Sequence, residues 1–516
     1  MPAEPSTTRP HVNPWIIAIS VMSATFMEVL DTTVVNVSLP HIAGNLSATI
    51  DEATLVLTSY LVANAIVLPM TGWLSNFFGR RRFLMTAVVG FTVASFLCGI
   101  APTLEALVFF RIVQGATGGA LQPISQSVML ESFPVESRGK AMGFWGLGII
   151  VAPILGPVFG GWLTDTYTWR WVFYINGPVG VISLLMIRQF VFDPPYIKRA
   201  TGGIDYWGIG MLAVGIGALQ YMLDKGQQED WFASGLIVGL AIAAAATLVV
   251  FAIRELSVAN PIVDLRVFKV REYTAGVFLM TVLGFVLYGS LVLLPIMLQT
   301  LFGYSAVQAG IATAPRGLGA LIFMPLVGMV MSKFDPRKLI GAGLLIGGSS
   351  LLWLGQLNLD AGYWDIFWPQ FIQGTSLGLI FVPLTTISMD AIPLHKMGNA
   401  TSLFSLMRNV GASIGIAMTG TWLVRQQQVQ TTVLGSHVDP YNEVARATLD
   451  TTRAAFVASG ADVATATQNA YGAVFGMVQQ QAAMVSFVQI FRTLGLIFIL
   501  MLPLLFVTRR PRHQRK

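Results

Sequence analysis

Long apolar runs follow one another along almost the whole chain, and short polar loops separate them. Fourteen of these runs are long enough to cross the roughly 30 Å hydrocarbon layer of a membrane as helices. They lie near residues 14–38, 53–75, 83–101, 104–132, 141–163, 172–190, 206–223, 232–254, 274–299, 306–331, 339–357, 366–390, 400–424 and 486–507. The pattern predicts an all-α integral membrane protein with fourteen transmembrane helices. Because fourteen is even, both termini are expected on the same side of the membrane.

One part of this pattern occurs twice. A shift of 259 residues superposes Gln114 on Gln373 without a gap, and a constant offset of this kind indicates an internal duplication. The same shift places Arg111 on Gln370, so the charge at that position belongs to the first copy. The copies lie an even number of spans apart and therefore run in the same direction. Parallel repeats with the binding site between them are a common plan in membrane transporters.

The duplication predicts an architecture in which two six-helix bundles form a parallel pseudo-repeat with two further helices inserted between them. The expected segments are an N-terminal cytoplasmic tail over 1–13, the first bundle over 14–190, a linker over 191–205, the inserted pair over 206–254, a second linker over 255–273, the second bundle over 274–507 and a basic tail over 508–516. The inserted helices carry few charges, so we expect them to lie away from the substrate path.

The second bundle contains a long loop, expected over residues 425–485 and outside the cytoplasm. It is rich in Ala, Gln and Thr, and apolar and polar residues alternate from Tyr471 to Met484 in a way that predicts an amphipathic helix. The loop is either a docking surface for a partner protein or a solvated connector. The sequence leaves both interpretations open.

Composition and charge agree with a membrane protein. Hydrophobic residues make up 54% of the chain and charged residues 11%, whereas about 25% charged residues is usual in soluble domains. The net charge of +6 does not indicate nucleic-acid binding, because the basic residues gather in alternating loops, for example Arg80–Arg82, Arg138 and Lys140, and in the C-terminal tail. By the positive-inside rule these loops place both termini in the cytoplasm.

Several chemistries are disfavoured by the residues present. Cys98 is the single cysteine, so neither an intrachain disulfide nor a cysteine metal site is expected. The five histidines are scattered, and the sequence has no phosphate-binding G-x-x-x-x-G-K motif, which argues against ATP as the energy source. Two G-x-S-x-G matches fall inside apolar runs, where small residues four apart indicate close helix packing. We therefore expect a protein that needs no metal or cofactor and is not an enzyme.

Two acidic residues in the first run are candidates for proton transport. Glu28 and Asp31 lie three residues apart, so their carboxylates share one face of a helix. In a site of low dielectric constant two neighbouring carboxylates do not both ionise cheaply, and one is expected to bind a proton. Arg111, a permanent cation in the fourth run, is the expected counter-charge. The structural alternatives are a hydrated or paired Glu28, an Asp31 that caps or packs, and an Arg111 that only completes a buried ion pair.

Other polar residues inside apolar runs are candidates for a substrate cavity. Arg408 and Arg316 are further intramembrane cations, which either attract an anionic substrate or act as counter-charges. Together with Arg408, the residues predicted to line the cavity or supply counter-charge are Gln114, Asn36, Gln370 and Gln373.

Five sequence motifs resemble those of a known transporter family. Gly72–Arg82 resembles the cytoplasmic loop of the major facilitator superfamily, although Asn76 and Phe77 stand where that loop usually has an aspartate and an arginine. Arg111–Gly115 resembles the fourth-span motif implicated in proton transfer, and Ala152–Gly161 resembles the fifth-span motif of antiporters. Two further stretches, Leu30–Val37 and Trp169–Asn176, are similar to marks of the fourteen-span drug:proton antiporters.

The resemblance implies roles for individual residues. The cytoplasmic gating loop contributes Gly72, Gly79, Arg80 and Arg81, and the antiporter motif contributes Pro153, Gly156, Pro157, Gly160 and Gly161. Nearly the whole chain resembles EmrB-type inner-membrane subunits of tripartite multidrug efflux systems. That likeness implies that protons entering the cell drive the export of drugs and other amphipathic compounds, which confers antibiotic resistance. It also implies a bacterial inner membrane, a periplasmic membrane-fusion protein of the EmrA type and a TolC-type outer-membrane channel.

Two other functions are considered. One is a dedicated exporter of a single metabolite, such as a fatty acid or a siderophore, that uses the same machinery. The other is a membrane-embedded enzyme or a sensor, which is disfavoured because the sequence offers neither a catalytic constellation nor a soluble signalling domain.

Overall fold

The computed structural model describes residues 13–193, 205–258, 260–331, 333–439 and 441–507, and helices make up the regular structure of these ranges. The first-half helices are α1 (Pro14–Asn45), α2 (Ile50–Ala53), α3 (Leu55–Val67), α4 (Thr71–Phe78), α5 (Arg80–Ile100), α6 (Leu104–Gly118), α7 (Leu121–Ser132), α8 (Arg138–Thr166), α9 (Trp171–Tyr174) and α10 (Asn176–Phe190). The remaining helices are α11 (Tyr206–Lys225), α12 (Gly235–Ser257), α13 (Arg271–Leu301), α14 (Ala306–Val330), α15 (Pro336–Leu354), α16 (Tyr363–Asp390), α17 (Met397–Gly435), α18 (Glu443–Ala458) and α19 (Val463–Leu500).

The helices stand where the apolar pattern predicts spans. Within the described part of the chain, twelve helical stretches are long and apolar enough to cross a membrane. The two other expected spans, 339–357 and 400–424, fall on α15 and α17, which contain many glycines and polar residues and are therefore less apolar. The protein is a multi-pass membrane protein. The basic tail, nearly all of the N-terminal tail and most of the linker 191–205 lie outside the described residues.

The two bundles repeat the same packing. Helix α16 begins 259 residues after α6, and α17 begins 259 residues after α8, which is the offset of the sequence duplication. The contacts correspond as well, because α1 packs on α8 and α10 in the first bundle, and α13 packs on α17 and α19 in the second. Likewise α6 packs on α3 and α5, and α16 packs on α14 and α15. The chain therefore has two six-helix bundles related by a parallel pseudo-repeat.

Close glycine contacts join the bundles near one end of the helices. We call this the basic end, because it carries Arg80–Arg82. Helix α4 meets α17 there, and a Cβ atom at Gly72 would lie 2.6 Å from the Cα atom of Asn399. Helix α8 meets α14, and a Cβ atom at Gly143 would lie 2.8 Å from the carbonyl oxygen of Met324. Larger side chains at these glycines would push the bundles apart at the basic end.

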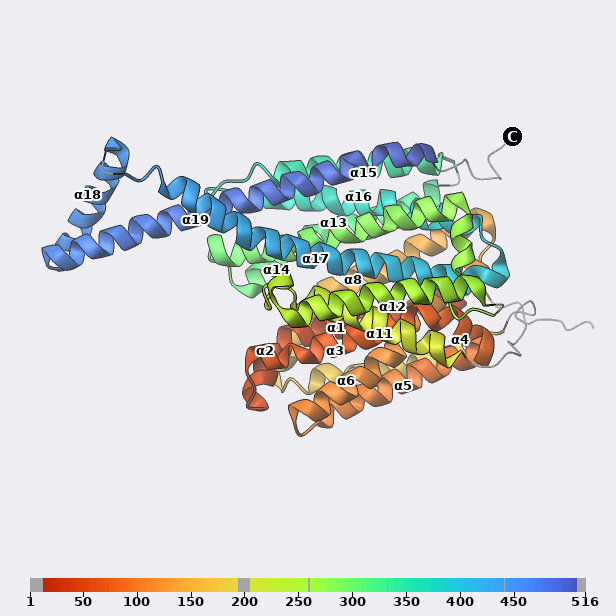
Figure 1. Cartoon of the computed structure of the whole chain (residues 1–516). Helices are drawn as coiled ribbons and strands as arrows, with labels where there is room; N and C mark the ends of the chain where they lie inside the picture. Colours follow the sequence, from red (N-terminus) through yellow and green to blue (C-terminus); the bar gives the residue numbers. More distant parts are fainter. Residues whose placement is uncertain (1–12, 194–204, 259, 332, 440, 508–516) are drawn as a thin grey trace, which may run out of the picture.

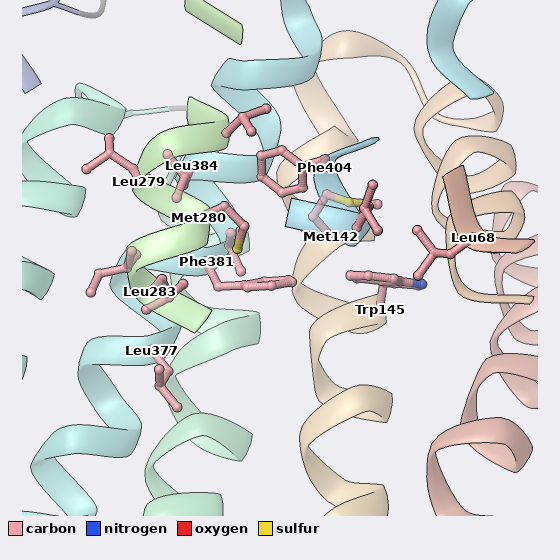
Figure 2. Close-up of a cluster of buried hydrophobic side chains, with 14 of the residues drawn as sticks. Leu68, Met142, Trp145, Leu279, Met280, Leu283, Leu377, Phe381, Leu384 and Phe404 are labelled. Atoms are coloured by element: carbon pink, nitrogen blue, oxygen red, sulfur yellow. The ribbon is translucent and has the colours of Figure 1, made fainter. Parts of the chain in front are cut away.

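An apolar cluster fills the seam between the bundles. Trp145 of α8 stacks on Phe381 of α16 with ring centroids 5.8 Å apart. Figure 2 shows these two rings pointing toward each other, with Met142 on the side of the first bundle and Leu283 and Phe404 on the side of the second. Burial of these large side chains excludes water from the seam and stabilises its closed arrangement.

The inserted pair lies across the seam rather than against one bundle alone. Helix α11 packs on α3 and on α17, and α12 packs on α11 (Figure 1). Gln220 Nε2 donates to Ser413 Oγ at 2.6 Å, and Trp231 Nε1 donates to Thr421 Oγ1 at 2.8 Å. These contacts tie the inserted pair to α17 of the second bundle, and the α3 contact ties it to the first.

The segment expected as a long loop over residues 425–485 is mostly helical. Helix α17 continues to Gly435, α18 follows, and α19 begins at Val463 and continues without interruption into the last span. The amphipathic stretch from Tyr471 to Met484 lies within α19. Figure 1 shows α18 and the adjoining part of α19 projecting well beyond the bundles, at the end opposite to the basic end. We call this projection, residues 436–439 and 441–484, the helical extension.

Candidate functional site

A buried ion pair lies at the centre of the first bundle. Arg111 Nη1 of α6 donates to Asp31 Oδ2 of α1 at 2.6 Å, and both side chains are fully buried. The other carboxylate oxygen accepts from Gln114 Nε2 at 2.9 Å and from Asn176 Nδ2 at 2.6 Å. All of these partners are donors, and an ionised carboxylate is the form that such an arrangement suits.

The surroundings of Arg111 hold it rigidly in this pair. Its Nε donates to the carbonyl oxygen of Val56 at 3.0 Å, and its Nη1 also donates to Gln114 Oε1 at 2.8 Å. The guanidinium carbon lies 4.1 Å from the ring centroid of Tyr60, within the range of a cation–π interaction. Loss of one partner from a buried pair of this kind costs about 3–5 kcal/mol, because the other charge is left uncompensated.

Glu28, one helical turn before Asp31, belongs to a second polar group. It accepts from Tyr60 Oη at 3.3 Å, from Asn64 Nδ2 at 3.1 Å and from Gln122 Nε2 at 2.6 Å. The Oε1 atom of Gln122 in turn accepts from Arg408 Nη2 at 2.6 Å. Because Arg408 lies on α17, this chain of hydrogen bonds connects the two bundles.

A third polar cluster lies in the second bundle at the positions that the duplication predicts. Arg316 Nη2 donates to Gln373 Oε1 at 2.5 Å and to Ser290 Oγ at 3.3 Å, and Gln370 Nε2 donates to Gln373 Oε1 at 3.5 Å. At the offset of 259 residues, the first-bundle counterparts of Ser290, Gln370 and Gln373 are Asp31, Arg111 and Gln114. Four of the predicted cavity residues therefore lie in three separate clusters instead of one: Gln114 in the first, Arg408 in the second, and Gln370 and Gln373 in the third.

Asn36 lies apart from all three clusters. It is exposed, together with Val37 and Pro40, on one face of α1 toward the end opposite to the basic end. The remainder of α1 packs against α8 and α10.

The glycines of the predicted antiporter motif have unequal surroundings. A Cβ atom at Gly156 would lie 2.0 Å from Thr33 Oγ1, and one at Gly160 would lie 2.9 Å from the carbonyl oxygen of Val34. A Cβ atom at Gly161 would have no neighbour within 4 Å. Gly156 and Gly160 thus permit the close approach of α8 to α1, and Gly161 does not contribute to it. Pro153 and Pro157 also lie within α8.

The predicted gating loop is fixed by ion pairs and a positive backbone angle. Gly79 has a φ angle of +86°, which favours glycine, and it separates α4 from α5. The Arg80 side chain forms a buried ion pair with Glu131 of α7. The backbone N–H of Arg81 donates to Asp193 Oδ1 at 2.8 Å. These contacts attach the loop to the first bundle, next to the contact between Gly72 and α17.

Sequence reasoning missed several residues of these clusters. Asn176 is the last residue of the Trp169–Asn176 motif, which in the sequence shows only a family resemblance. Its contact with Asp31 depends on how α10 packs on α1. Tyr60 and Asn64 carried no signal, because a single tyrosine or asparagine is common in apolar helices. Ser290 was open to prediction, since applying the 259-residue offset to Asp31 identifies it.

Comparisons with known proteins agree with this architecture. The family described as the Major Facilitator Superfamily matches residues 21–416. The chain is 40% identical to the Multidrug export protein EmrB of Haemophilus influenzae, covering 84% of each chain, and 38% identical to the Fatty acid resistance protein FarB of Neisseria gonorrhoeae, covering 96% of each. The crystal structure of the human organic anion transporter MFSD10 shares the fold with a TM-score of 0.60 at 13% identity, covering 96% of this chain and 100% of that one. This protein belongs to the Major Facilitator Superfamily and is therefore a membrane transporter, not an enzyme.

Proposed function

We propose that the protein exports drugs and other hydrophobic or amphipathic compounds in exchange for protons. The observation that carries this proposal is the fully buried Asp31–Arg111 pair at the centre of the first bundle. The likeness to proteins named as multidrug export proteins in Haemophilus influenzae and Escherichia coli supports the direction and the class of transport.

In the proposed mechanism Asp31 carries the proton. Its carboxylate accepts hydrogen bonds from Arg111, Gln114 and Asn176. A proton on either oxygen would remove the negative charge and replace an acceptor by a donor. The hydrogen bonds between Asp31 and these partners would then be weaker. The buried Arg111 would then favour a different arrangement of the bundles, in which the proton is released to the cytoplasm. Substrate leaves in the opposite half of the cycle.

Glu28 is the second proposed proton group, and it acts at the seam. Its link to Arg408 through Gln122 exists only while the bundles keep their present spacing. Protonation of Glu28 would weaken that link, and separation of the bundles would break it. Proton binding and the movement of the bundles are thereby coupled.

The proposal includes a tripartite assembly in a bacterial inner membrane. We propose that both termini are cytoplasmic, since the basic loops follow the positive-inside rule. The helical extension then lies in the periplasm, where exposed apolar residues such as Val444 and Val463 suit contact with an EmrA-type membrane-fusion protein. A TolC-type channel would complete the path out of the cell.

A dedicated exporter of one metabolite is the alternative. The relative named Fatty acid resistance protein FarB matches 96% of this chain, which favours a fatty acid over a siderophore. A multidrug exporter and a dedicated exporter would use the same proton machinery and would differ in the range of compounds they export.

The test is efflux of a fluorescent hydrophobic dye from proteoliposomes, with and without an imposed pH gradient. Wild type is expected to accelerate efflux when the gradient is applied. Asp31→Asn is expected to lose this response, because the side chain no longer binds and releases a proton. Asp165→Asn, which removes an exposed carboxylate at the end of α8, is the matched control and should behave as wild type.

Asp31→Asn leaves Arg111 without its charge partner, so a second variant is needed for the case in which Asp31→Asn does not fold. The double variant Asp31→Asn with Arg111→Gln has no uncompensated charge, and it should fold and also lack the gradient response. A gradient response of wild-type size in either folded variant would refute Asp31 as the proton carrier.

A further inference from the structure

Arg316 is a buried cation for which the described residues provide no acidic partner. Its side chain on α14 is 5% exposed and donates from Nη2 to Gln373 and Ser290. Its Nε and Nη1 atoms have no hydrogen-bond partner among the described residues. Burial of a charged group is unfavourable unless hydrogen bonds and an opposite charge compensate it. The cluster therefore has unused capacity for an anion.

The first bundle shows what this cluster lacks. There, Asp31 neutralises Arg111 within the corresponding cluster. In the second bundle Ser290 stands at the position of Asp31, and the arginine enters from α14 instead of α16. The first cluster is neutral when its carboxylate is ionised, whereas the second carries one net positive charge.

Arg408, the other buried arginine of the second bundle, differs from Arg316. It donates to Gln122, which leads on to the carboxylate of Glu28, so an acidic group of the protein lies within its hydrogen-bond network. The network of Arg316 ends in amide and hydroxyl groups. Of these two arginines, Arg316 is the one with no acidic group in its hydrogen-bond network among the described residues.

The chemistry of the missing group follows from the free donors. A carboxylate or phenolate oxygen is negatively charged and accepts charge-assisted hydrogen bonds from a guanidinium. The helices around the cluster, α13, α14 and α16, are apolar, so the rest of the ligand is hydrophobic. We infer that the Arg316 cluster binds the anionic head group of an amphipathic organic substrate. This inference rests on the proposed export function and names the class of compound exported.

Direct binding tests the inference without a pH gradient. The purified full chain in detergent is titrated with dansylaminoundecanoic acid and, separately, with its uncharged methyl ester, and fluorescence reports binding. Arg316→Gln is expected to bind the acid about tenfold or more weakly, the size of one charge-assisted hydrogen bond, and the ester as wild type does. Arg271→Gln removes an exposed positive charge at the start of α13 and serves as the control.

A second variant tests the same point by adding a charge. Ser290→Asp reproduces the first-bundle arrangement, because it places a carboxylate next to Arg316. This variant should melt at a higher temperature than wild type and should lose selectivity for the acid over the ester. If Arg316→Gln does not fold, the Ser290→Asp variant alone tests whether the Arg316 cluster binds the anionic head group. Wild-type affinity for the acid in either folded variant, or an equal loss for acid and ester, would overturn the inference.

The two proposals fail separately. If wild type binds the acid selectively but its efflux ignores the pH gradient, proton coupling is wrong and the anion site stands. If efflux follows the gradient but the acid and ester bind equally, the anion site is wrong and the proposed function stands.

Discussion

Gln122 of α7 forms a hydrogen-bond bridge between the two bundles. Its amide donates to Glu28 of α1 and accepts from Arg408 of α17. An amide suits this place because it satisfies an anion on one side and a cation on the other without a charge of its own. Two buried charges therefore depend on one neutral side chain.

Replacing Gln122 by leucine is expected to destabilise the protein. Glu28 and Arg408 would each lose a short hydrogen bond while remaining buried, at a cost of about 1–3 kcal/mol per group. Thermal unfolding in detergent should show a lower melting temperature than wild type. Gln126→Leu is the matched control one turn along α7, since the Gln126 amide is buried with no hydrogen-bond partner in the described residues. Equal melting temperatures for the two variants would contradict this account of Gln122.

At the residue scale, sequence reasoning identifies charges better than it identifies their partners. Asp31 and Arg111 stand out because ionisable groups are rare in apolar runs, and the structure brings them together. Their amide partners are ordinary residues whose positions depend on helix rotation. Glu28 illustrates the limit, because its spacing from Asp31 predicts a shared site whereas the structure gives each carboxylate its own set of donors.

At the scale of single elements, the glycine face of α8 determines how closely that helix approaches α1. Gly156 and Gly160 lie on this face, four residues apart, and Gly161 lies beside it. The sequence predicts the helix and its close packing, since small residues at helical spacing permit such contacts. It does not distinguish Gly160 from Gly161, because the direction in which each glycine faces depends on the rotation of α8 about its axis.

Gly156→Ala is expected to weaken the packing of α8 on α1. The new methyl group would lie 2.0 Å from Thr33 Oγ1, and relief of such overpacking typically costs about 1–3 kcal/mol. The melting temperature and the rate of gradient-driven efflux should both fall. Gly161→Ala adds the same methyl group to the same helix in open space, so it should match wild type in both measurements. Alanine favours a helix more than glycine does, so helix propensity does not explain a loss, and a similar loss in both variants would contradict the packing role of Gly156.

At the scale of the whole molecule, the structure shows one arrangement of two bundles, joined near the basic end by glycine contacts and the Trp145–Phe381 stack. The duplication in the sequence predicts the two bundles, and the structure reproduces its offset. The sequence does not predict which end of the seam is closed, because that depends on how the two bundles tilt relative to each other. Transport of a compound across the membrane requires this closed end to open in part of the cycle.

A reversible cross-link across the closed end is expected to stop transport. Ser75 lies on α4 and Gly398 on α17, and a Cβ atom at Gly398 would lie 3.5 Å from Ser75 Oγ, which is close to disulfide reach. The double variant Ser75→Cys with Gly398→Cys should therefore form a disulfide on mild oxidation. Cys98 is buried and remains in place. Oxidised proteoliposomes should lose gradient-driven dye efflux, and a reductant should restore it.

The extent of cross-linking and the efflux must be compared in the same samples. Loss of maleimide labelling measures the cross-linked fraction, and the efflux rate should fall in proportion to it, because each cross-linked molecule is held with its basic end closed. The single variant Ser75→Cys controls for the substitution and for the oxidant. If fully cross-linked protein still exports dye at the rate of its reduced form, the bundles do not separate at this end, and the path of the substrate must avoid the seam between α4 and α17.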